Sequence, residues 1–254
     1  MSRDNNWVSK ILLFRMLATI CLLLAVLLLT WHILLLHVII IPLILLAIFV
    51  LIYFAYARYE FSPQGGDIQA KISQRVIDFI DQSESGQILD VGCGNGKLTV
   101  ELAKKCPGIK IQAIDYWSGM WGYSKESCET TAKNENVSDR IIFTKASASA
   151  LPFDDETFDA VISNMVFHEV ADTKDKRDVI KEALRPLKKG GLFIFQDQFN
   201  TKRIYGTVEE LLKYLKNLGI NDVGFEDTRK ASFIPVLLRN PIFVGDIGLI
   251  YGKK

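Results

Sequence analysis

The segment that most constrains the fold is a run of 42 residues, 16–57, that contains no Asp, Glu, Lys or Arg. As one straight helix this run would be ~63 Å long at ~1.5 Å per residue, about twice the ~30 Å hydrocarbon thickness of a bilayer. The run is therefore expected to turn back on itself. We place one membrane span at residues 11–29, a tight turn at residues 30–32, and a second span at residues 34–56.

Two other interpretations of the apolar run remain open. A cleaved signal peptide requires a small-residue cleavage site followed by polar sequence, and the run lacks this pattern. A single long span would require the rest of the apolar residues to be buried elsewhere. In the hairpin that we favour, Pro42 is a tolerated kink inside the second span.

The basic residues predict the orientation of this hairpin. Three of them flank the first span and Arg58 follows the second, whereas the turn contains no Lys or Arg. Lys and Arg are enriched on the cytoplasmic side of membrane spans. We therefore expect a two-span membrane protein in which residues 1–60 form the transmembrane hairpin and residues 61–254 form a cytoplasmic catalytic domain.

The sequence after the hairpin alternates between helix and strand patterns. Apolar residues recur every four positions from Ile68 to Ile80, as in an amphipathic helix packed on a core. Short apolar runs then predict strands, and crossover helices between the first five strands imply a parallel sheet. A helix with a capping box of Thr207 and Glu210 ends at Gly219, and the last two strands should pair antiparallel at the sheet edge. The predicted strands are QILDV, KIQAID, RIIFTKA, FDAVISN, LFIFQDQ, VGFEDTR and DIGLIYGK.

Charge and cysteine content argue against two classes of function. Residues 61–254 contain 26 basic and 27 acidic side chains, which is not the charge of a nucleic-acid-binding surface. Cys93, Cys106 and Cys128 form no CxxC pair and have no histidine at metal-ligand spacing. We therefore expect no nucleic-acid partner, no disulfide framework and no metal site.

The stretch QILDVGCGNGKLTVELA predicts a ligand-binding turn between a strand and a helix. Gly92, Gly94 and Gly96 form a GxGxG pattern, and Lys97 stands where a dinucleotide-binding fingerprint has its third glycine. Asp90, at the end of the strand, would repel a pyrophosphate but suits a ligand with positive charge. S-adenosylmethionine has an ammonium and a sulfonium and no phosphate. The pattern therefore favours this cofactor over a purely structural glycine turn.

From about Phe61 to Lys254 the chain resembles the class I S-adenosylmethionine-dependent methyltransferases, in particular the small-molecule branch with the ubiquinone and menaquinone C-methyltransferases. LDVGCGNG is similar to the first motif of the family, and AIDYW is similar to its second strand end. ASALPFDDETFDAVISNMVFHEV is similar to the adenine loop and fourth strand, and LRPLKKGGLFIFQD to the fifth strand and its lead-in. The resemblance implies an α/β, Rossmann-like seven-stranded sheet with the last strand antiparallel.

The resemblance also implies how the nucleoside of the cofactor would be held. Asp115 would accept hydrogen bonds from the ribose hydroxyls, and it lies 23 residues after Gly92, as expected for such an acid on the next strand. Tyr116 or Trp117 would cover one face of the adenine, unless they pack in the core.

One part of the sequence departs from the family pattern. The family usually has Gly-Asp before AxxLPF, where this chain has Ala146 and Ser147. A serine hydroxyl still accepts a hydrogen bond from the adenine amino group but lacks the charge of an aspartate. We keep Ser147 and Ala148 among the cofactor-binding residues. An inactive cofactor domain becomes a somewhat stronger alternative.

Methyl transfer is an in-line displacement on an activated carbon, so positioning and desolvation supply most of the rate. A base is needed only when the acceptor loses a proton. His168 is the sole histidine outside the apolar run and stands just past the fourth strand, where ligands of open α/β sheets bind. We therefore take it as the candidate catalytic base, with a hydrogen-bonded helix-start histidine as the alternative. Glu169 fits a helix start better, and Asn164 would contact the methionine end of the cofactor or the acceptor.

The hairpin narrows the class of acceptor. Residues 57–66 link the second span to the domain and reach at most ~35 Å when fully extended, so the active site stays close to the lipid surface. This favours an acceptor dissolved in the membrane, such as a lipid or a quinone. Trp117, Trp121 and Tyr123 would line an apolar pocket for it, or pack in the core. The alternatives are a soluble small-molecule acceptor, a non-catalytic membrane-anchored S-adenosylmethionine-binding protein, and an NAD-dependent oxidoreductase, against which the turn sequence argues.

Overall fold

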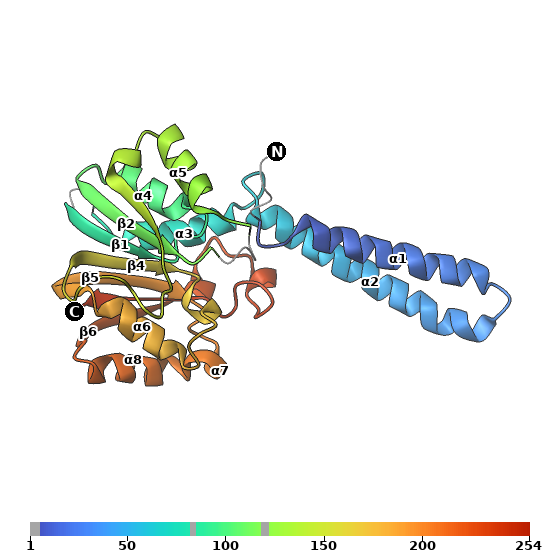
Figure 1. The fold of residues 1–254 in the computed structure, drawn as a ribbon. Coiled ribbons are helices and arrows are strands. Elements are labelled where there is room, and N and C mark those ends of the chain that lie inside the picture. The colour runs from blue at the N-terminus through green and yellow to red at the C-terminus, as the bar shows by residue number, and fades with distance from the viewer. Residues whose placement is uncertain (1–5, 82–84, 118–121) are drawn as a thin grey trace. The chain divides into compact units, whose positions relative to one another are not determined.

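The computed structural model describes residues 6–81, 85–117 and 122–254. The chain divides into two compact units, residues 1–71 and residues 72–254. Figure 1 shows a helical hairpin in the first unit and a sheet covered by helices in the second.

The first unit is built on two long apolar helices, α1 (Lys10–Leu29) and α2 (Leu34–Phe61). The Ser9 side chain caps α1 by accepting a hydrogen bond from the backbone N–H of Ile11. The helices pack against each other through a small apolar cluster that contains Ile20, Ile40 and Ile44. The two predicted apolar helices are therefore confirmed. The second extends past the expected residue 56 to Phe61 and includes the predicted Pro42.

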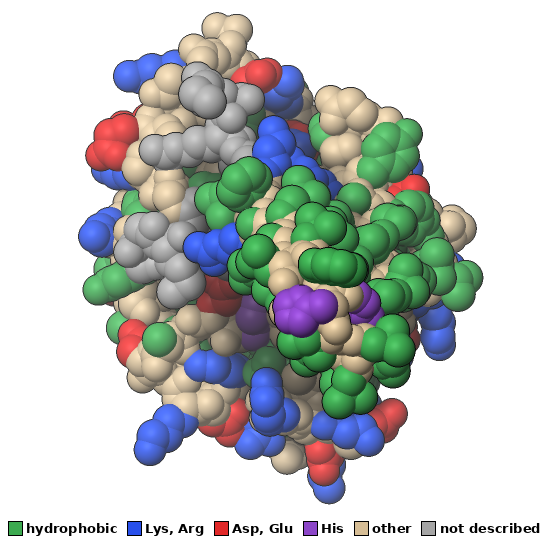
Figure 2. All heavy atoms as spheres, turned by 90° about the vertical axis from the view of Figure 1, so that its right-hand side faces the viewer, with side chains coloured by type: hydrophobic (Ala, Val, Ile, Leu, Met, Phe, Trp, Pro, Cys, Tyr) green, Lys and Arg blue, Asp and Glu red, His purple; other side chains and the backbone are tan. Residues whose placement is uncertain are grey.

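Most of the hairpin surface is apolar and exposed. In the most apolar 18-residue window of each helix, only 6% of α1 and 11% of α2 is buried. Figure 2 shows hydrophobic side chains gathered over the end of the hairpin that faces the viewer. A core helix of a soluble protein is mostly buried, whereas little of these two helices is buried.

The second unit is a seven-stranded sheet with the strand order β3-β2-β1-β4-β5-β7-β6. The first five strands are parallel, and β7 runs antiparallel to both of its neighbours, β5 and β6. The predicted antiparallel last strand is confirmed, but β7 lies inside the sheet and β6 forms the edge. The strands are β1 (Gly86–Val91), β2 (Ile109–Asp115), β3 (Ile141–Lys145), β4 (Phe158–Asn164), β5 (Leu187–Asp197), β6 (Asp222–Asp227) and β7 (Gly248–Lys253).

Helices cover both faces of this sheet (Figure 1). One apolar layer packs α3, α4 and α5 on the sheet, and the other packs α6, α7 and α8. The predicted capping box is present at the start of α8, where Thr207 and Glu210 exchange hydrogen bonds. The helices are α3 (Ile68–Asp78), which crosses the boundary between the two units, α4 (Lys97–Lys105), α5 (Lys125–Asn134), α6 (Lys176–Leu184), α7 (Lys202–Tyr205) and α8 (Val208–Asn217).

The carboxyl ends of the parallel strands lie on one side of the sheet, which we call the carboxyl edge. It is not the lateral edge that β6 forms. Asn164 at the end of β4 is in register with Gln196 of β5. Asp197, the last residue of β5, is in register with Gly248 of β7, which in turn faces Asp227 of β6. Ligands of open α/β sheets bind outside this edge, and most of the predicted site residues lie along it.

Candidate functional site

Three glycines shape the turn between β1 and α4. Gly92, Gly94 and Gly96 have φ angles of +79°, +56° and +75°, in the left-handed region that favours glycine. A Cβ at Gly92 would also lie 2.3 Å from Cγ2 of Val166, which leaves no room for a side chain. The pattern therefore specifies the sharp strand-to-helix connection that the sequence predicted.

Asp115, at the end of β2, holds this turn. Its Oδ2 accepts a hydrogen bond from the backbone N–H of Gly94 at 2.8 Å, and its Oδ1 accepts one from Trp117 N–H at 2.7 Å. The Trp117 indole N–H donates to the Gly94 carbonyl oxygen at 2.9 Å. Each carboxylate oxygen has a second lone pair, so Asp115 keeps acceptor capacity for a ligand beside the turn.

The structure separates the two aromatic residues that were candidates for adenine contact. Trp117 packs against the apolar layer around α4 and α5. Tyr116 is 62% exposed, and the Lys145 ammonium lies 5.4 Å from the centre of its ring. Of the two rings, only that of Tyr116 presents a large exposed surface at the end of β2.

Asp90 lies beneath the glycine turn and is 1% exposed. The Thr99 hydroxyl, on α4, donates a hydrogen bond to its Oδ2 at 2.5 Å. Burial raises the pKa of Asp90 to about 7, the Thr99 hydrogen bond opposes this rise, and the charge of Asp115 adds to it. A cation bound above the turn would favour the ionised carboxylate. The sequence predicted the charge complementarity but did not reveal Thr99.

The loop after β3 contains a carboxylate contact that the sequence analysis missed. The hydroxyls of Ser147 and Ser149 lie 2.8 Å apart and both donate to Oδ2 of Asp172, at 3.0 Å and 2.7 Å. These hydrogen bonds, first that of Ser149, lower the pKa of Asp172. Ala148 between the serines is buried. Asp172, 25 positions after Ser147, therefore places a carboxylate beside the Ser147 hydroxyl.

His168 lies in a short 3-10 helix (η2, Phe167–Glu169) after β4 and is bound to a buried carboxylate. Its Nδ1 is 2.6 Å from Oδ1 of Asp197, which is fully buried at the end of β5. The other oxygen of Asp197 accepts the backbone N–H groups of Val166 and Phe167. Burial opposes protonation of the ring, but the hydrogen bond and charge of Asp197 outweigh it and raise the pKa of His168. The alternative of a hydrogen-bonded histidine is thus compatible with a base whose Nε2 stays available.

Asn164 and Gln196 bring buried amide atoms without a hydrogen-bond partner among the described residues to the same edge. The Asn164 Nδ2 donates to the Ser73 hydroxyl at 3.2 Å, but its buried Oδ1 has no hydrogen-bond partner among the described residues. Gln196 is 1% exposed, and neither end of its amide has a partner in that part of the chain. Such buried groups cost free energy unless a ligand or water binds them. Gln196 was missed because its strand pattern suggested only a core position.

Two other predicted residues lie near the turn. The Tyr123 ring faces Gly94, since a Cβ at Gly94 would lie 3.6 Å from Tyr123 Cδ2. Burial, then the charges of Glu169 and Asp115, raise the pKa of Tyr123. Glu169 Oε1 lies 3.7 Å from Nε2 of His168. Trp121, the third member of the predicted aromatic cluster, lies outside the described residues.

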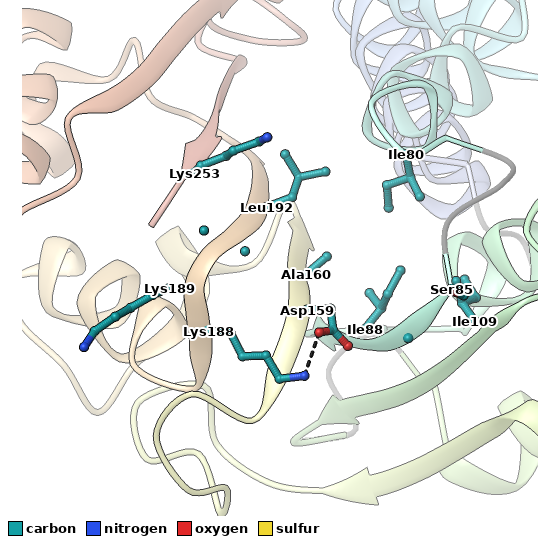
Figure 3. Close-up of a pocket in the computed structure, with 13 residues that line it drawn as sticks. Ile80, Ser85, Ile88, Ile109, Asp159, Ala160, Lys188, Lys189, Leu192 and Lys253 are labelled. Carbon is teal, nitrogen blue, oxygen red and sulfur yellow. Dashed lines mark hydrogen bonds and ion pairs between the residues drawn. The ribbon is translucent and has the colours of Figure 1, made fainter.

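A cavity of about 290 Å³ opens at the opposite, amino-terminal edge of the sheet (Figure 3). Its lining includes Asp159 at the start of β4 and Lys188 in β5, which form an ion pair at 2.6 Å. The lining contains neither the glycine turn nor any residue predicted to bind the cofactor. We therefore place the candidate site at the carboxyl edge.

Comparison with known proteins identifies a related domain over part of the chain. Residues 89–195 match the family model described as a methyltransferase domain. The chain is 29% identical over 131 residues to the ubiquinone/menaquinone biosynthesis C-methyltransferase of Geobacter sulfurreducens, covering 51% of this chain and 48% of the relative. It is 32% identical over 152 residues to the demethylmenaquinone methyltransferase of Lactococcus lactis, covering 59% and 55%. The chain spans only 30% to 56% of the length of these and similar curated relatives.

Solved structures give the same fold. Geranyl diphosphate C-methyltransferase from Streptomyces coelicolor, solved with geranyl diphosphate and S-adenosyl-L-homocysteine, aligns with a TM-score of 0.56 at 14% identity, over 73% of this chain and 79% of that one. Residues 89–195 thus match a methyltransferase domain, and the sheet that contains them has the fold of a solved S-adenosylmethionine-dependent methyltransferase.

Proposed function

We propose that this protein is a membrane-anchored methyltransferase that moves a methyl group from S-adenosylmethionine to a small acceptor in the membrane, such as a lipid or a quinone. The observation that most supports the proposal is the glycine turn, which lies between the buried Asp90 and the Asp115 carboxylate. This combination suits a cofactor that is positively charged at its methionine end and has ribose hydroxyls.

The cofactor would lie along the carboxyl ends of β1 and β2. In this arrangement the backbone at Gly92, Gly94 and Gly96 approaches the methionine part, and Asp115 accepts from the ribose. Tyr116 covers the adenine, and Ser147 with Ala148 forms the wall next to its amino group. Support comes from the exposed ring of Tyr116 and from the Asp172 carboxylate on Ser147. When bound, S-adenosylmethionine supplies a methyl group that its sulfonium already activates.

The acceptor would lie between the ends of β4 and β5. The unpartnered Oδ1 of Asn164 and both ends of the Gln196 amide offer acceptors and a donor for a polar group such as a hydroxyl or carbonyl. The imidazole of His168 donates through Nδ1 to Asp197. Its Nε2 lone pair can then take a proton from a methyl acceptor that must lose one. Asp197 is thus a positioning residue, and His168 is the base.

The hairpin supports placement at a membrane. At ~1.5 Å per residue α1 is ~30 Å long, which matches the hydrocarbon thickness of a bilayer. The helices expose large apolar side chains over nearly their whole length, including Leu28 at 74% and Phe49 at 67%. We propose that residues 1–60 form a two-span anchor and that the methyltransferase domain, residues 61–254, faces the cytoplasm.

One experiment tests both parts of this proposal. The full chain, in vesicles, is incubated with methyl-labelled S-adenosylmethionine and either fractionated membrane lipid or soluble metabolites. We expect label in the organic extract from lipid fractions. Label only in the aqueous phase would favour a soluble acceptor, and cofactor binding without any transfer would favour a non-catalytic binding protein.

A further inference from the structure

The connection between β6 and β7, residues 228–247, exposes three large apolar side chains. Val236, Leu237 and Ile242 are exposed to 77%, 63% and 65%. They lie close together in the sequence, on either side of Pro241. Single exposed apolar residues are common on proteins, but a group of this kind in one segment marks an interaction surface.

The segment holds these side chains outward in a defined structure. Val236–Leu238 forms a 3-10 turn in which the Leu238 N–H donates to the Pro235 carbonyl at 2.9 Å. The Gly245 N–H donates to the Asn240 carbonyl at 2.8 Å and closes the second half of the segment. Four other apolar residues are buried and anchor the segment to the domain: Ile234, Leu238, Val244 and Ile247. The three exposed side chains therefore belong to an ordered, hydrogen-bonded segment.

The segment begins at the same edge of the sheet as the candidate active site. Asp197, which binds His168, and Asp227, the last residue of β6, are both in register with Gly248. Strands β5 and β6 are separated by β7 alone, so the two aspartates lie about 10 Å apart at the usual strand spacing.

The linker between the hairpin and the domain is short. Residues 62–67 between α2 and α3 extend to at most ~20 Å. Within the domain, the Ser73 hydroxyl on α3 accepts from Asn164, at the end of β4. Arg75, one half-turn further along, forms an ion pair with Glu226 next to the segment. The part of the domain nearest in sequence to the hairpin thus contacts the carboxyl edge of the sheet.

Charge favours a lipid surface as the partner. Residues 228–247 contain three basic residues and one acidic residue. Lys230 and Arg239 are exposed and stand on the two sides of the Val236–Leu238 turn. Apolar side chains flanked by Lys and Arg are typical of segments that lie in the interface of a membrane with anionic lipids.

We propose that residues 228–247 form a membrane-docking segment. Val236, Leu237 and Ile242 enter the interfacial layer of the bilayer that the hairpin spans, and they turn the carboxyl edge of the sheet toward the lipid. An acceptor dissolved in the membrane then reaches His168 without crossing water. The inference rests on the proposed membrane anchor, but it does not depend on methyl transfer.

Fluorescence quenching by brominated lipids tests this proposal on the full chain. The protein is placed in vesicles of phosphatidylcholine and phosphatidylglycerol, and a thiol-reactive fluorophore is attached to Val236→Cys or Ile242→Cys in a Cys21→Ala background. The other three cysteines are buried. Ile142→Cys is the matched control, because Ile142 is 64% exposed on β3, at the far end of the strand order from β6. We expect at least about threefold stronger quenching at positions 236 and 242 than at position 142.

A fluorophore on native Cys21, within α1, reports on the hairpin independently. Quenching at Cys21 together with equal, weak quenching at positions 242 and 142 would overturn the docking segment and leave the anchor intact. Absence of quenching at all positions, Cys21 included, would overturn both. Energy transfer between labels at position 242 on two copies of the chain measures whether these surfaces lie next to each other. If it is efficient in detergent as well as in vesicles, the surface binds a second copy and the lipid proposal fails.

Discussion

His168 Nδ1 lies 2.6 Å from Oδ1 of Asp197, a carboxylate that is fully buried. Backbone N–H groups from Val166, Phe167 and Gln198 also donate to this carboxylate. These hydrogen bonds hold the carboxylate in place, and the carboxylate fixes which nitrogen of the imidazole has the proton. The imidazole side chain itself is 14% exposed, so its Nε2 is the nitrogen that can exchange a proton with a ligand.

The first prediction concerns this pair. Asp197 raises the pKa of His168 above the ordinary value of 6.5. The neutral imidazole, which is the base, forms only above this raised pKa, so turnover should rise as the pH passes through it. Asp197→Asn removes the charge, so the midpoint of the kcat/KM profile should move to lower pH. His168→Asn should lower turnover by about 10²-fold or more. Identical pH profiles for wild type and Asp197→Asn would show that the pair has no part in proton transfer.

Asp90 should make stability depend on pH. Its carboxyl has a pKa of about 7 in the folded protein against an ordinary value of 3.8, so between these values the unfolded chain releases a proton that the folded chain keeps. Stability is therefore lost as pH rises from about 4 to 7, by a few kcal/mol. Asp90→Asn lacks this titration. Denaturant unfolding at pH 5 and pH 8 should show wild type losing stability relative to Asp90→Asn, and a constant difference between the two proteins would contradict the assignment.

Asp172 should contribute to cofactor affinity through Ser147 and Ser149. Asp172→Asn removes the charge that holds the two hydroxyls and should weaken S-adenosylmethionine binding by roughly 1–2 kcal/mol. Asp175→Asn is the matched control, because Asp175 caps α6 and pairs with Arg177 rather than with the serines. Equal affinities for the two variants in equilibrium binding would show that Asp172 only shapes the loop.

Removing residues 1–60 should separate anchoring from chemistry. A domain joined to a membrane anchor by the short linker of residues 62–67 meets a dissolved lipid more often than a free enzyme does, so truncation should lower turnover on a bilayer acceptor by at least ~10-fold. Cofactor affinity and turnover on a detergent-solubilised acceptor should stay nearly unchanged. Equal activity of the truncated protein on both forms of the acceptor would show that the hairpin only locates the protein at a membrane and does not aid turnover.

Most of the fold was predictable because it depends on local patterns. The seven strands lie at the seven apolar runs, and the capping box of Thr207 and Glu210 marks a real helix start. The apolar run could also be divided into two helices by length alone. The sequence did not reveal that β7 enters the sheet between β5 and β6, because strand order depends on packing between distant segments.

The site was predictable where one short motif builds it and not where distant segments meet. The glycine turn and its neighbour Asp115, which do lie together, could be predicted as one cluster because their spacing follows from one strand–turn–helix unit and the next strand. The partners Thr99, Asp172 and Asp197 were missed, since each contacts its target across a fold that the sequence pattern does not encode locally. The exposed side chains at Val236 and Ile242 were likewise indistinguishable from core residues before the structure showed their exposure.

The central claim, that the glycine turn with Asp115 binds S-adenosylmethionine, is tested most directly by calorimetry on the full chain in detergent. The wild-type protein should bind the cofactor at one site. Asp115→Ala should bind it more weakly by ~1–3 kcal/mol, because the ribose hydroxyls lose a charged acceptor. Unfolding of the variant is followed in parallel, since Asp115 also accepts from Gly94 and Trp117. Unchanged affinity in a folded Asp115→Ala protein, or no binding by the wild type, would contradict the account.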